Sequence, residues 1–302
     1  MIYDCIVVGG GASGMSTALY LLRNNKKVLI IEKENFGGQI ANSPRVENFP
    51  SIKEISGLDF SDHLFEQIND LGVEFELEDV ETLTKNDDGT FKVVTNYNEY
   101  QAKTVVLANG VKHRLMNLPN EEQLIGNGIS FCAVCDGPML KGKDVYLIGD
   151  ANTALQYALL LTDYCPRVHM FTLFDHFFGD QVLIDKVKSN ERILVTHNMN
   201  LVEYKGEEKL TGLVFENTVD HVKTEYQTDN VFVCIGQIPQ NDRFADLLML
   251  DKGYIITNES METKTPGLYA VGDTRKKDVR QLVTACNDGA IAALSIIRYL
   301  AQ

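Results

Sequence analysis

The stretch Cys5-Ile6-Val7-Val8-Gly9-Gly10-Gly11-Ala12-Ser13-Gly14 decides the fold of this chain. It begins with a continuous apolar run, which is typical of a strand buried on both faces of a parallel sheet. The glycines that follow have the pattern G-x-G-x-x-G, and residues 13–22 carry small and apolar side chains at helical spacing. This order predicts a strand, a tight turn and a helix whose N-terminus faces the pyrophosphate of a dinucleotide.

A second apolar run, residues 28–31, completes a βαβ unit and is closed by Glu32. Glu32 lies 32 − 9 = 23 residues after the first glycine, where a carboxylate can hold the hydroxyl groups of a ribose. The motif on its own is weak, but strand, helix and acid together make it a strong signal. The candidate cofactor-binding residues of this unit are Gly9, Gly11, Ala12, Ser13, Gly14 and Glu32.

A second unit of the same kind begins 145 − 4 = 141 residues later, with an apolar run over 145–149. A helical pattern over 154–162 and a returning strand over 167–171 follow it. We therefore expect two related nucleotide-binding domains, joined near residues 112–118 and 240–246. The other expected elements are β-rich stretches at 91–95, 104–107, 210–216 and 230–235, and a long amphipathic helix over 281–300.

Length and composition agree with a two-domain enzyme. The chain has 302 residues, and 44% of them are hydrophobic and 23% charged, which is ordinary globular composition. The net charge of 28 − 42 = −14 opposes general binding to nucleic acid or anionic membranes. No apolar run is long enough to span a membrane, and residues 1–4 lack the basic start of a secretory signal. Six cysteines are too few for a disulfide scaffold, so a cytoplasmic enzyme is expected.

The segment Cys132-Ala133-Val134-Cys135-Asp136 is a C-x-x-C motif followed directly by an acid. A zinc site is disfavoured because no second cysteine or histidine pair is evident, and the other four cysteines are too isolated for an iron–sulfur cluster. Two chance cysteines remain the plain alternative. A redox-active dithiol fits best, with Asp136 placed to move a proton as the disulfide opens. No metal is expected.

A further signal lies at Gly272-Asp273, where a short strand ends before Arg280-Gln281 and the start of a helix. An aspartate at such a turn can accept a hydrogen bond from a ribityl hydroxyl. The helix N-terminus can stabilise negative charge on a flavin ring. In isolation an ordinary turn would explain this segment equally well.

Together these motifs resemble the low-molecular-weight thioredoxin reductases over essentially the whole chain. Gly37-Gly38-Gln39, residues 46–50 and Ala108-Asn109-Gly110 add to the resemblance. It implies an α/β fold of two Rossmann-like, three-layer ββα domains, with residues 115–243 inserted into an FAD-binding domain of 1–114 and 244–302. It also implies a homodimer in which Cys135 faces the flavin and Cys132 attacks thioredoxin. The further FAD-binding residues that it implies are Lys33, Gly38, Gln39, Asn48, Ala108, Gly110, Gly272, Asp273, Arg280, Gln281 and Leu282.

The second domain departs from the family pattern. Its turn reads Gly149-Asp150-Ala151-Asn152-Thr153-Ala154, where Ala151 puts a Cβ close to the expected pyrophosphate and Asp150 adds negative charge. No Lys or Arg occurs over residues 168–185, where the family has an arginine pair for the 2′-phosphate. These features predict that NADPH is an unlikely substrate. Phe171, Phe174, Phe177 and Phe178 are expected to fill the vacated groove. Plain core packing is the alternative, and it fits Phe171 better than the other three.

If the nicotinamide site is lost, a one-electron carrier is the natural electron donor to the flavin. A thioredoxin reductase sequence with an altered second turn and no arginine pair resembles the ferredoxin-dependent flavin thioredoxin reductases. A positive patch of Arg275, Lys276, Lys277 and Arg280 is the expected ferredoxin-docking surface, with Lys112, His113 and Arg114 as a second cluster. Three other functions stay open. They are an NAD(P)H-dependent thioredoxin reductase with a divergent site, an oxygen-using dithiol oxidase, and a flavin–dithiol redox sensor without turnover.

Overall fold

The computed structural model describes residues 1–43, 46–131 and 133–302, and the chain divides into two compact units. Unit 1 contains Met1–Lys112 and Ile238–Gln302, and unit 2 contains His113–Gln237. Strands β7 (Val111–His113) and β16 (Gln237–Pro239) pair with each other where the chain passes from one unit to the other and back.

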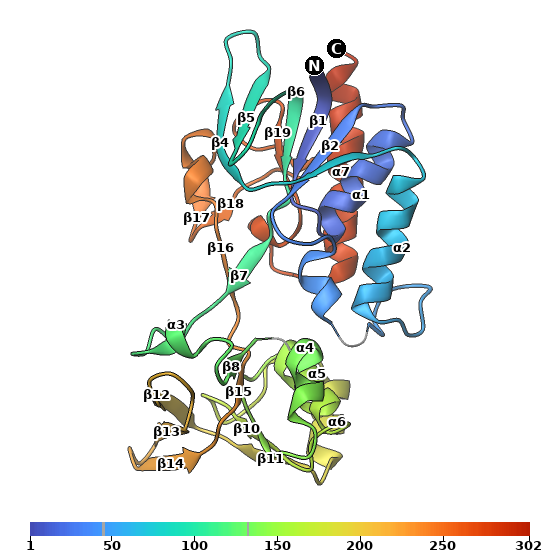
Figure 1. Cartoon of the computed structure of the whole chain (residues 1–302). Coiled ribbons are helices and arrows are strands. Elements are labelled where there is room, and N and C mark those ends of the chain that lie inside the picture. Colours follow the sequence, from blue (N-terminus) through green and yellow to red (C-terminus); the bar gives the residue numbers. More distant parts are fainter. Residues whose placement is uncertain (44–45, 132) are drawn as a thin grey trace. The chain divides into compact units, whose positions relative to one another are not determined.

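The core of unit 1 is a parallel sheet (Figure 1). Its strand order is β3 (Glu74–Leu77), β2 (Val28–Glu32), β1 (Ile2–Val8), β6 (Glu99–Leu107) and β19 (Leu268–Ala270). The second half of β6 pairs in parallel with β1 and β19. Its first half pairs antiparallel with β5 (Phe91–Thr95), which continues to β4 (Val80–Lys85). This second pairing explains why β6 begins five residues earlier than the expected start at residue 104.

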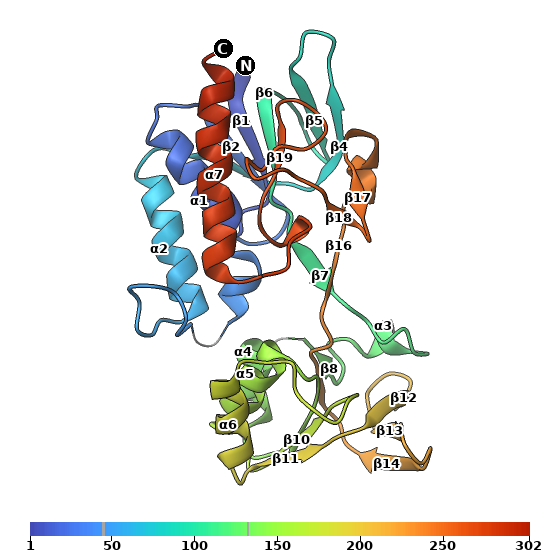
Figure 2. The ribbon, with the colours of Figure 1, turned by 180° about the vertical axis from the view of Figure 1, so that it is seen from behind.

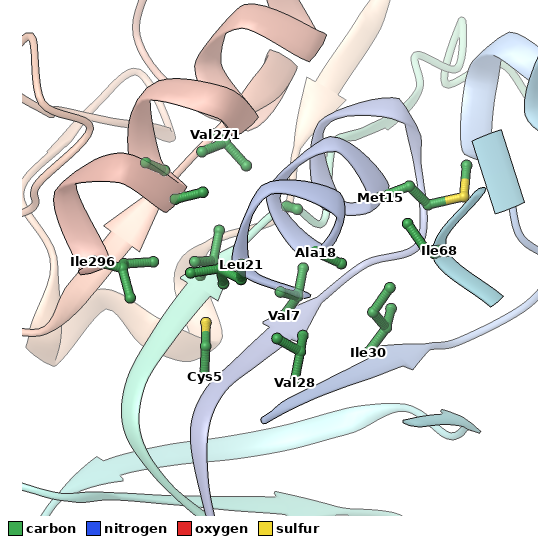
Figure 3. Packing of buried hydrophobic residues seen from close by; sticks show 14 of the residues in the cluster. Cys5, Val7, Met15, Ala18, Leu21, Val28, Ile30, Ile68, Val271 and Ile296 are labelled. Atoms are coloured by element: carbon green, nitrogen blue, oxygen red, sulfur yellow. The ribbon is translucent and has the colours of Figure 1, made fainter. Parts of the chain in front are cut away.

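Helices and antiparallel strands cover opposite faces of this sheet. Helices α1 (Ala12–Leu22), α2 (Gly57–Asn69) and α7 (Leu282–Leu300) lie side by side on one face, as Figure 2 shows from behind. Cys5, Val7, Val28 and Ile30 point toward these helices and pack with side chains such as Met15 and Leu21 (Figure 3). Their neighbours Ile6, Val8, Leu29 and Ile31 point the other way and pack with residues of β4 and β5. The continuous apolar runs are therefore buried on both faces.

Unit 2 repeats this plan with a smaller sheet. Its parallel strands lie in the order β11 (Ile193–Thr196), β10 (Val168–Phe171), β9 (Val145–Ile148), β15 (Val231–Val233) and β8 (Ile129–Ser130). Helices α5 (Asn152–Leu161) and α6 (Gln181–Ser189) pack on one face. Strands β12 (Met199–Lys205), β13 (Gly212–Asn217) and β14 (Lys223–Gln227) form an antiparallel sheet whose side chains pack with the other face.

The expected fold class is confirmed: the chain is an α/β protein with two Rossmann-like sheets. In the described ranges, no helix is both long and apolar enough to cross a membrane. The remaining short elements are η1 (Gly38–Asn42), α3 (Glu121–Leu124), α4 (Ala133–Asp136), η2 (Gly137–Leu140), η3 (Asp242–Leu247), β17 (Leu250–Asp251), β18 (Tyr254–Ile255) and η4 (Gly272–Thr274).

Candidate cofactor-binding and redox sites

In unit 1 the predicted cofactor-binding residues gather at one edge of the sheet. Strands β2, β1, β6 and β19 are neighbours, and a predicted segment lies at or just after the end of each strand. These segments contain Glu32, the turn 9–14, residues 108–110 and the turn 272–273. Because parallel strands end at the same edge, the sheet itself brings together residues that are far apart in the sequence.

The first glycine turn is built for close backbone approach. Gly9 has φ +110°, and a Cβ there would overlap the carbonyl oxygen of Ala108. A Cβ at Gly14 would overlap the carbonyl oxygen of Gly9. Gly11, the N-cap of α1, differs, because a Cβ there would meet no described protein atom nearer than 3.8 Å. The chain itself leaves room at Gly11, so that space is open to a ligand.

Glu32 is held in one orientation by the backbone. Its Oε2 accepts a hydrogen bond from the Gly10 N–H at 2.6 Å, and its Oε1 accepts one from Glu34 N–H at 2.9 Å. The carboxylate is thus fixed beside the glycine turn, as its spacing in the sequence led us to expect. Lys33 next to it is exposed, with Nζ 3.9 Å from the Glu34 carboxylate.

The turn after β19 contains a buried acceptor. Gly272 has φ +74°, and a Cβ there would overlap the side chain of Ser13, so this turn lies directly against the start of α1. The Oδ1 atom of Asp273 is buried and accepts no hydrogen bond. Burial raises the pKa of Asp273, and the positive charge of Lys277 acts in the opposite direction. Arg280 packs its guanidinium 4.1 Å from the ring centre of Tyr254.

The other predicted residues lie on segments of the same unit. Asn48 Nδ2 donates to Gln281 Oε1 at 3.1 Å, although 233 positions separate the two residues. Gln281 caps α7, and Leu282 is the first residue of that helix. Asn109 is not among the predicted site residues, but its Oδ1, like that of Asp273, is buried and has no hydrogen-bond partner. Gly38 and Gln39 begin η1, Ala108 is buried after β6, and Gly110 has φ +60°.

These features fit FAD. The site offers an unobstructed helix N-cap at Gly11, a fixed carboxylate at Glu32 and a buried acceptor without a donor at Asp273. A dinucleotide supplies a pyrophosphate and several hydroxyl donors, which match these groups. The individual residue assignments stay predictions.

The turn of unit 2 has the same backbone as that of unit 1. Gly149 has φ +152°, and a Cβ there would overlap the carbonyl oxygen of Cys234, the counterpart of the contact between Gly9 and Ala108. Ala151 caps α5 with φ −116° and ψ −178°, and Gly11 caps α1 with φ −77° and ψ −178°. Both conformations are open to any residue. The turn therefore keeps an extended N-cap after a glycine with positive φ, although Asp150 and Ala151 depart from the family pattern.

Side chains around this second turn differ from those of unit 1. Thr172, which follows β10 as Glu32 follows β2, donates from Oγ1 to the carbonyl oxygen of Phe174 at 2.7 Å and lies 2.6 Å from His197 Nδ1. The Asp150 carbonyl accepts a hydrogen bond from Phe178 N–H at 2.7 Å. Burial raises the pKa of the Asp150 carboxyl group.

The expected filling of a groove by aromatic side chains is only partly right. Phe171 lies in the core, with its ring centre 4.2 Å from that of Phe215. Phe177 is half-buried against His197. Phe174 and Phe178 are instead 47% and 57% exposed, with ring centres 5.4 Å apart. They fill no groove, because they pack on each other at the surface.

The dithiol segment is described only in part. Cys132 lies outside the described residues, and Cys135 belongs to α4, where its side chain is likewise not described. Asp136 Oδ2 accepts a hydrogen bond from the hydroxyl of Ser130, at the end of β8. Cys5, Cys165, Cys234 and Cys286 are free thiols. Within the described ranges, no cluster of His, Cys, Asp or Glu suits a metal ion.

The expected ferredoxin-docking patch is wrong. Arg275 and Lys277 have side chains only 14% and 9% exposed, and both pair with the buried Asp288 of α7 at 3.0 Å. Lys276 pairs with Asp251. Three of the four expected charges are therefore paired with acids of other elements, and the fourth, Arg280, packs on the ring of Tyr254. The second cluster also loses charge, because burial lowers the pKa of His113. Asp288 could not be recognised from the sequence, since an acid inside a long helix resembles an ordinary surface residue.

Comparison with known proteins shows the family to which the chain is similar. Residues 3–289 match the family described as pyridine nucleotide-disulphide oxidoreductase. The thioredoxin reductase of Bacillus subtilis (strain 168) is 36% identical over 304 residues, covering 100% of this chain and 96% of that protein. The thioredoxin reductase of Lactococcus lactis superposes with a TM-score of 0.95 at 32% identity, covering 99% of both chains. That of T. acidophilum gives a TM-score of 0.94 at 30% identity, again covering 99% of both chains.

These matches correct two expectations. The prediction of a ferredoxin-dependent enzyme is wrong, because the family that matches both units is defined by pyridine nucleotides and the relatives are thioredoxin reductases. The prediction that NADPH is an unlikely substrate is overturned with it. The physical reason lies in the turn of unit 2. Its backbone keeps the shape of a dinucleotide-binding turn despite Asp150 and Ala151.

Proposed function

Because this chain belongs to the pyridine nucleotide-disulphide oxidoreductases and is related to thioredoxin reductases over its whole length, we propose that it reduces thioredoxin with electrons from NAD(P)H. The proposal includes FAD in unit 1, the pyridine nucleotide in unit 2 and a redox-active disulfide between Cys132 and Cys135. A homodimer and a cytoplasmic location stay predictions from the sequence.

The repeated glycine turn is the observation that carries this proposal. Gly9 and Gly149 each follow the central strand of a parallel sheet, and each is pressed against the carbonyl oxygen of a neighbouring strand end. Each is followed by a helix with an extended N-cap residue, Gly11 or Ala151. Two such turns support two dinucleotide sites, which a transfer from a nucleotide to a flavin requires.

Residues of unit 1 would hold FAD by complementary polar groups. The N-terminus of α1 would face the pyrophosphate, Glu32 a ribose and Asp273 a hydroxyl of the ribityl chain. When bound, FAD supplies the two-electron chemistry that links a nicotinamide to a disulfide. Asp273 and Glu32 then act by binding and orientation, since both are held close to the turn 9–14.

The disulfide is the proposed exit for the electrons. Two electrons and two protons convert the Cys132–Cys135 disulfide into two thiols. The Cys132 thiolate attacks the thioredoxin disulfide and releases one thioredoxin thiol, which leaves a mixed disulfide. The Cys135 thiolate then displaces the second thioredoxin thiol and restores the original bond. Asp136, hydrogen-bonded to Ser130, is the nearest described acid in the sequence and is proposed to hold and move one proton.

The test has two anaerobic steps. Absorbance near 450 nm is followed after NADPH or NADH is added to the purified flavoprotein, and oxidised thioredoxin is then added. We expect rapid bleaching by at least one nucleotide and recovery of the colour with thioredoxin. Failure of both nucleotides to bleach the flavin would refute the proposal. Oxygen consumption driven by small dithiols, in a protein whose flavin neither nucleotide bleaches, would show a dithiol oxidase instead.

Two cysteine variants test the roles of the dithiol. Cys135→Ser should trap a mixed disulfide between Cys132 and thioredoxin, and Cys132→Ser should trap none while the flavin is still bleached. Cys165→Ser is the matched control, because a serine can keep the bond that Cys165 Sγ donates to the Leu140 carbonyl. Trapping by the Cys132→Ser protein would reverse the two assignments.

A further inference from the structure

A buried group of charges supports the turn that carries Asp273. Asp288 lies on the inner side of α7 with only 4% of its side chain exposed. Its Oδ2 accepts hydrogen bonds from Gly272 N–H at 3.1 Å and from Lys277 Nζ at 3.0 Å, and its Oδ1 accepts one from Arg275 Nη1 at 3.0 Å. One carboxylate thus holds two cations and the backbone of the turn.

Lys277 lies between two acids, Asp288 and Asp273, and is closer to the first. Its Nζ is 3.0 Å from Asp288 Oδ2 and 3.5 Å from Asp273 Oδ1. The longer contact is an ion pair at the limit of hydrogen-bond distance, and Asp273 Oδ1 is a buried oxygen that accepts no hydrogen bond. The side chain of Lys277 is 9% exposed, so water cannot easily replace either acid as its partner.

We propose that Asp288 is a positioning residue for FAD, because it binds the Lys277 ammonium and so keeps Asp273 Oδ1 open to a hydroxyl of the cofactor. This inference rests on the proposed FAD site. It assigns a role to Asp288 and Lys277, which do not belong to the predicted set of cofactor-binding residues.

The physical reason is competition for one cation. A buried ammonium that loses its counter-ion attracts the next available carboxylate strongly, because the surroundings screen charge poorly. Without the negative charge of Asp288, Lys277 would form a full ion pair with Asp273. The carboxylate would then be occupied, and the cofactor hydroxyl would lose its acceptor. Asp288 therefore acts on FAD through Lys277, not through contact.

The test compares three variants of the holoenzyme. The FAD dissociation constant is measured from the flavin fluorescence released on serial dilution, and stability is followed by thermal denaturation. Asp288→Asn should weaken FAD binding at least about tenfold, which corresponds to loss of one charge-assisted hydrogen bond. Lys277→Gln should change the constant less than about threefold. The double variant Asp288→Asn/Lys277→Gln should return to within about threefold of wild type.

Recovery of FAD binding in the double variant distinguishes the positioning role of Asp288 from a merely structural role. If Asp288 only stabilised α7 and the turn, removing Lys277 as well would not restore FAD binding, and that result would overturn the proposal. If Asp288→Asn alone fails to fold, the double variant still tests the proposal. Tight FAD binding by this variant, which lacks both Asp288 and Lys277, would show that Asp288 is needed only while Lys277 is present. Lys276→Gln is the control, since this neighbouring lysine pairs with Asp251 at the surface.

The outcome also distinguishes this inference from the proposed function. Wild-type protein that retains no FAD would refute the flavin site itself. Wild-type protein that retains FAD, with an unrescued or unaffected Asp288→Asn variant, would refute the role of Asp288 alone.

Discussion

Gly9 in unit 1 and Gly149 in unit 2 stand at the same point of two similar sheets. Each has a φ angle that side-chain-bearing residues rarely adopt, +110° and +152°, and each leaves no room for a Cβ beside a carbonyl oxygen. Around this shared backbone the polar groups differ. Unit 1 has a fixed carboxylate at Glu32 and open space at Gly11, and unit 2 has Thr172 and Ala151.

The comparison of the two turns shows that the glycine motif meets two separate requirements, one of the chain's own backbone and one of the ligand. The glycine that permits the turn is needed by the chain itself, because any side chain would collide with the backbone. The residues that face a ligand can change without loss of the fold. We therefore expect Asp150 and Ala151 to change the affinity for a nucleotide without removing the turn itself.

Substitution of the two turn glycines should have the largest effect. Gly9→Ala should destabilise unit 1 by about 3 kcal/mol or more and yield protein without FAD, because the Cβ overlaps Ala108. Gly149→Ala should destabilise unit 2 by a similar amount, keep FAD and lose reduction by NAD(P)H. Flavin content and thermal denaturation measure both. Gly89→Ala is the control, since its φ of +85° is also positive, a Cβ there meets no described atom within 4 Å, and the residue lies outside the predicted sites. Loss of FAD from Gly149→Ala would contradict separate sites.

Exchange of the helix-cap residues should have the next largest effect. Gly11→Ala should leave the melting temperature nearly unchanged, because no described protein atom lies within 3.8 Å of the new Cβ. It should weaken FAD binding about tenfold or more by occupying the ligand's space. Ala151→Gly should do the reverse and lower the KM for the nucleotide several-fold. Equal FAD affinity in Gly11→Ala and wild type would show that the pyrophosphate lies elsewhere.

Replacement of Glu32, the acid at the end of β2, should have a moderate effect on FAD binding. Glu32→Gln keeps an acceptor for Gly10 N–H but loses the charge, so FAD binding should weaken roughly tenfold. Thr172→Val in unit 2 should cost about 1 kcal/mol of stability by breaking the bond to the Phe174 carbonyl. It should leave the nucleotide KM nearly unchanged. A large rise of that KM would mean that Thr172 contacts the nucleotide, as Glu32 is expected to contact FAD.

The smallest expected effect concerns Asp150. Its pKa is raised by burial, so its negative charge develops as the pH rises through that raised value. Nucleotide affinity should then fall with rising pH, because the charge repels the pyrophosphate. The folded state binds this proton more tightly than the unfolded state, so stability also falls over the same pH range. Asp150→Asn should remove both trends and tighten nucleotide binding about threefold at neutral pH. A persistent pH dependence in that variant would assign it to another group.

Much of the fold could be predicted because its signals are local. The apolar runs at 5–8, 28–31 and 145–148 are buried on both faces, and the glycines follow them directly. The fixed carboxylate of Glu32 could be predicted for the same reason, since its distance from Gly9 is set by one strand, one helix and a second strand.

The charge network could not be predicted, because its members interact through space. Arg275 and Lys277 read as exposed charges next to Lys276, and only the packing of α7 shows that Asp288 neutralises them. The backbone of the second turn could not be predicted either. The sequence shows that Ala151 brings a Cβ close to the expected pyrophosphate, but not that the N-cap keeps an extended backbone like that of Gly11.

The position of β19 has a consequence for synthesis of the protein. This strand pairs with β6 through residues 268–270, so the whole of unit 2 emerges from the ribosome between the two partners. Unit 2 is a continuous stretch and can fold as soon as residue 237 has emerged. Until β19 and α7 follow, β6 offers an unpaired edge, and the apolar face of α1 has no cover from α7. The nascent chain therefore carries a folded unit 2 and an unfinished, aggregation-prone unit 1.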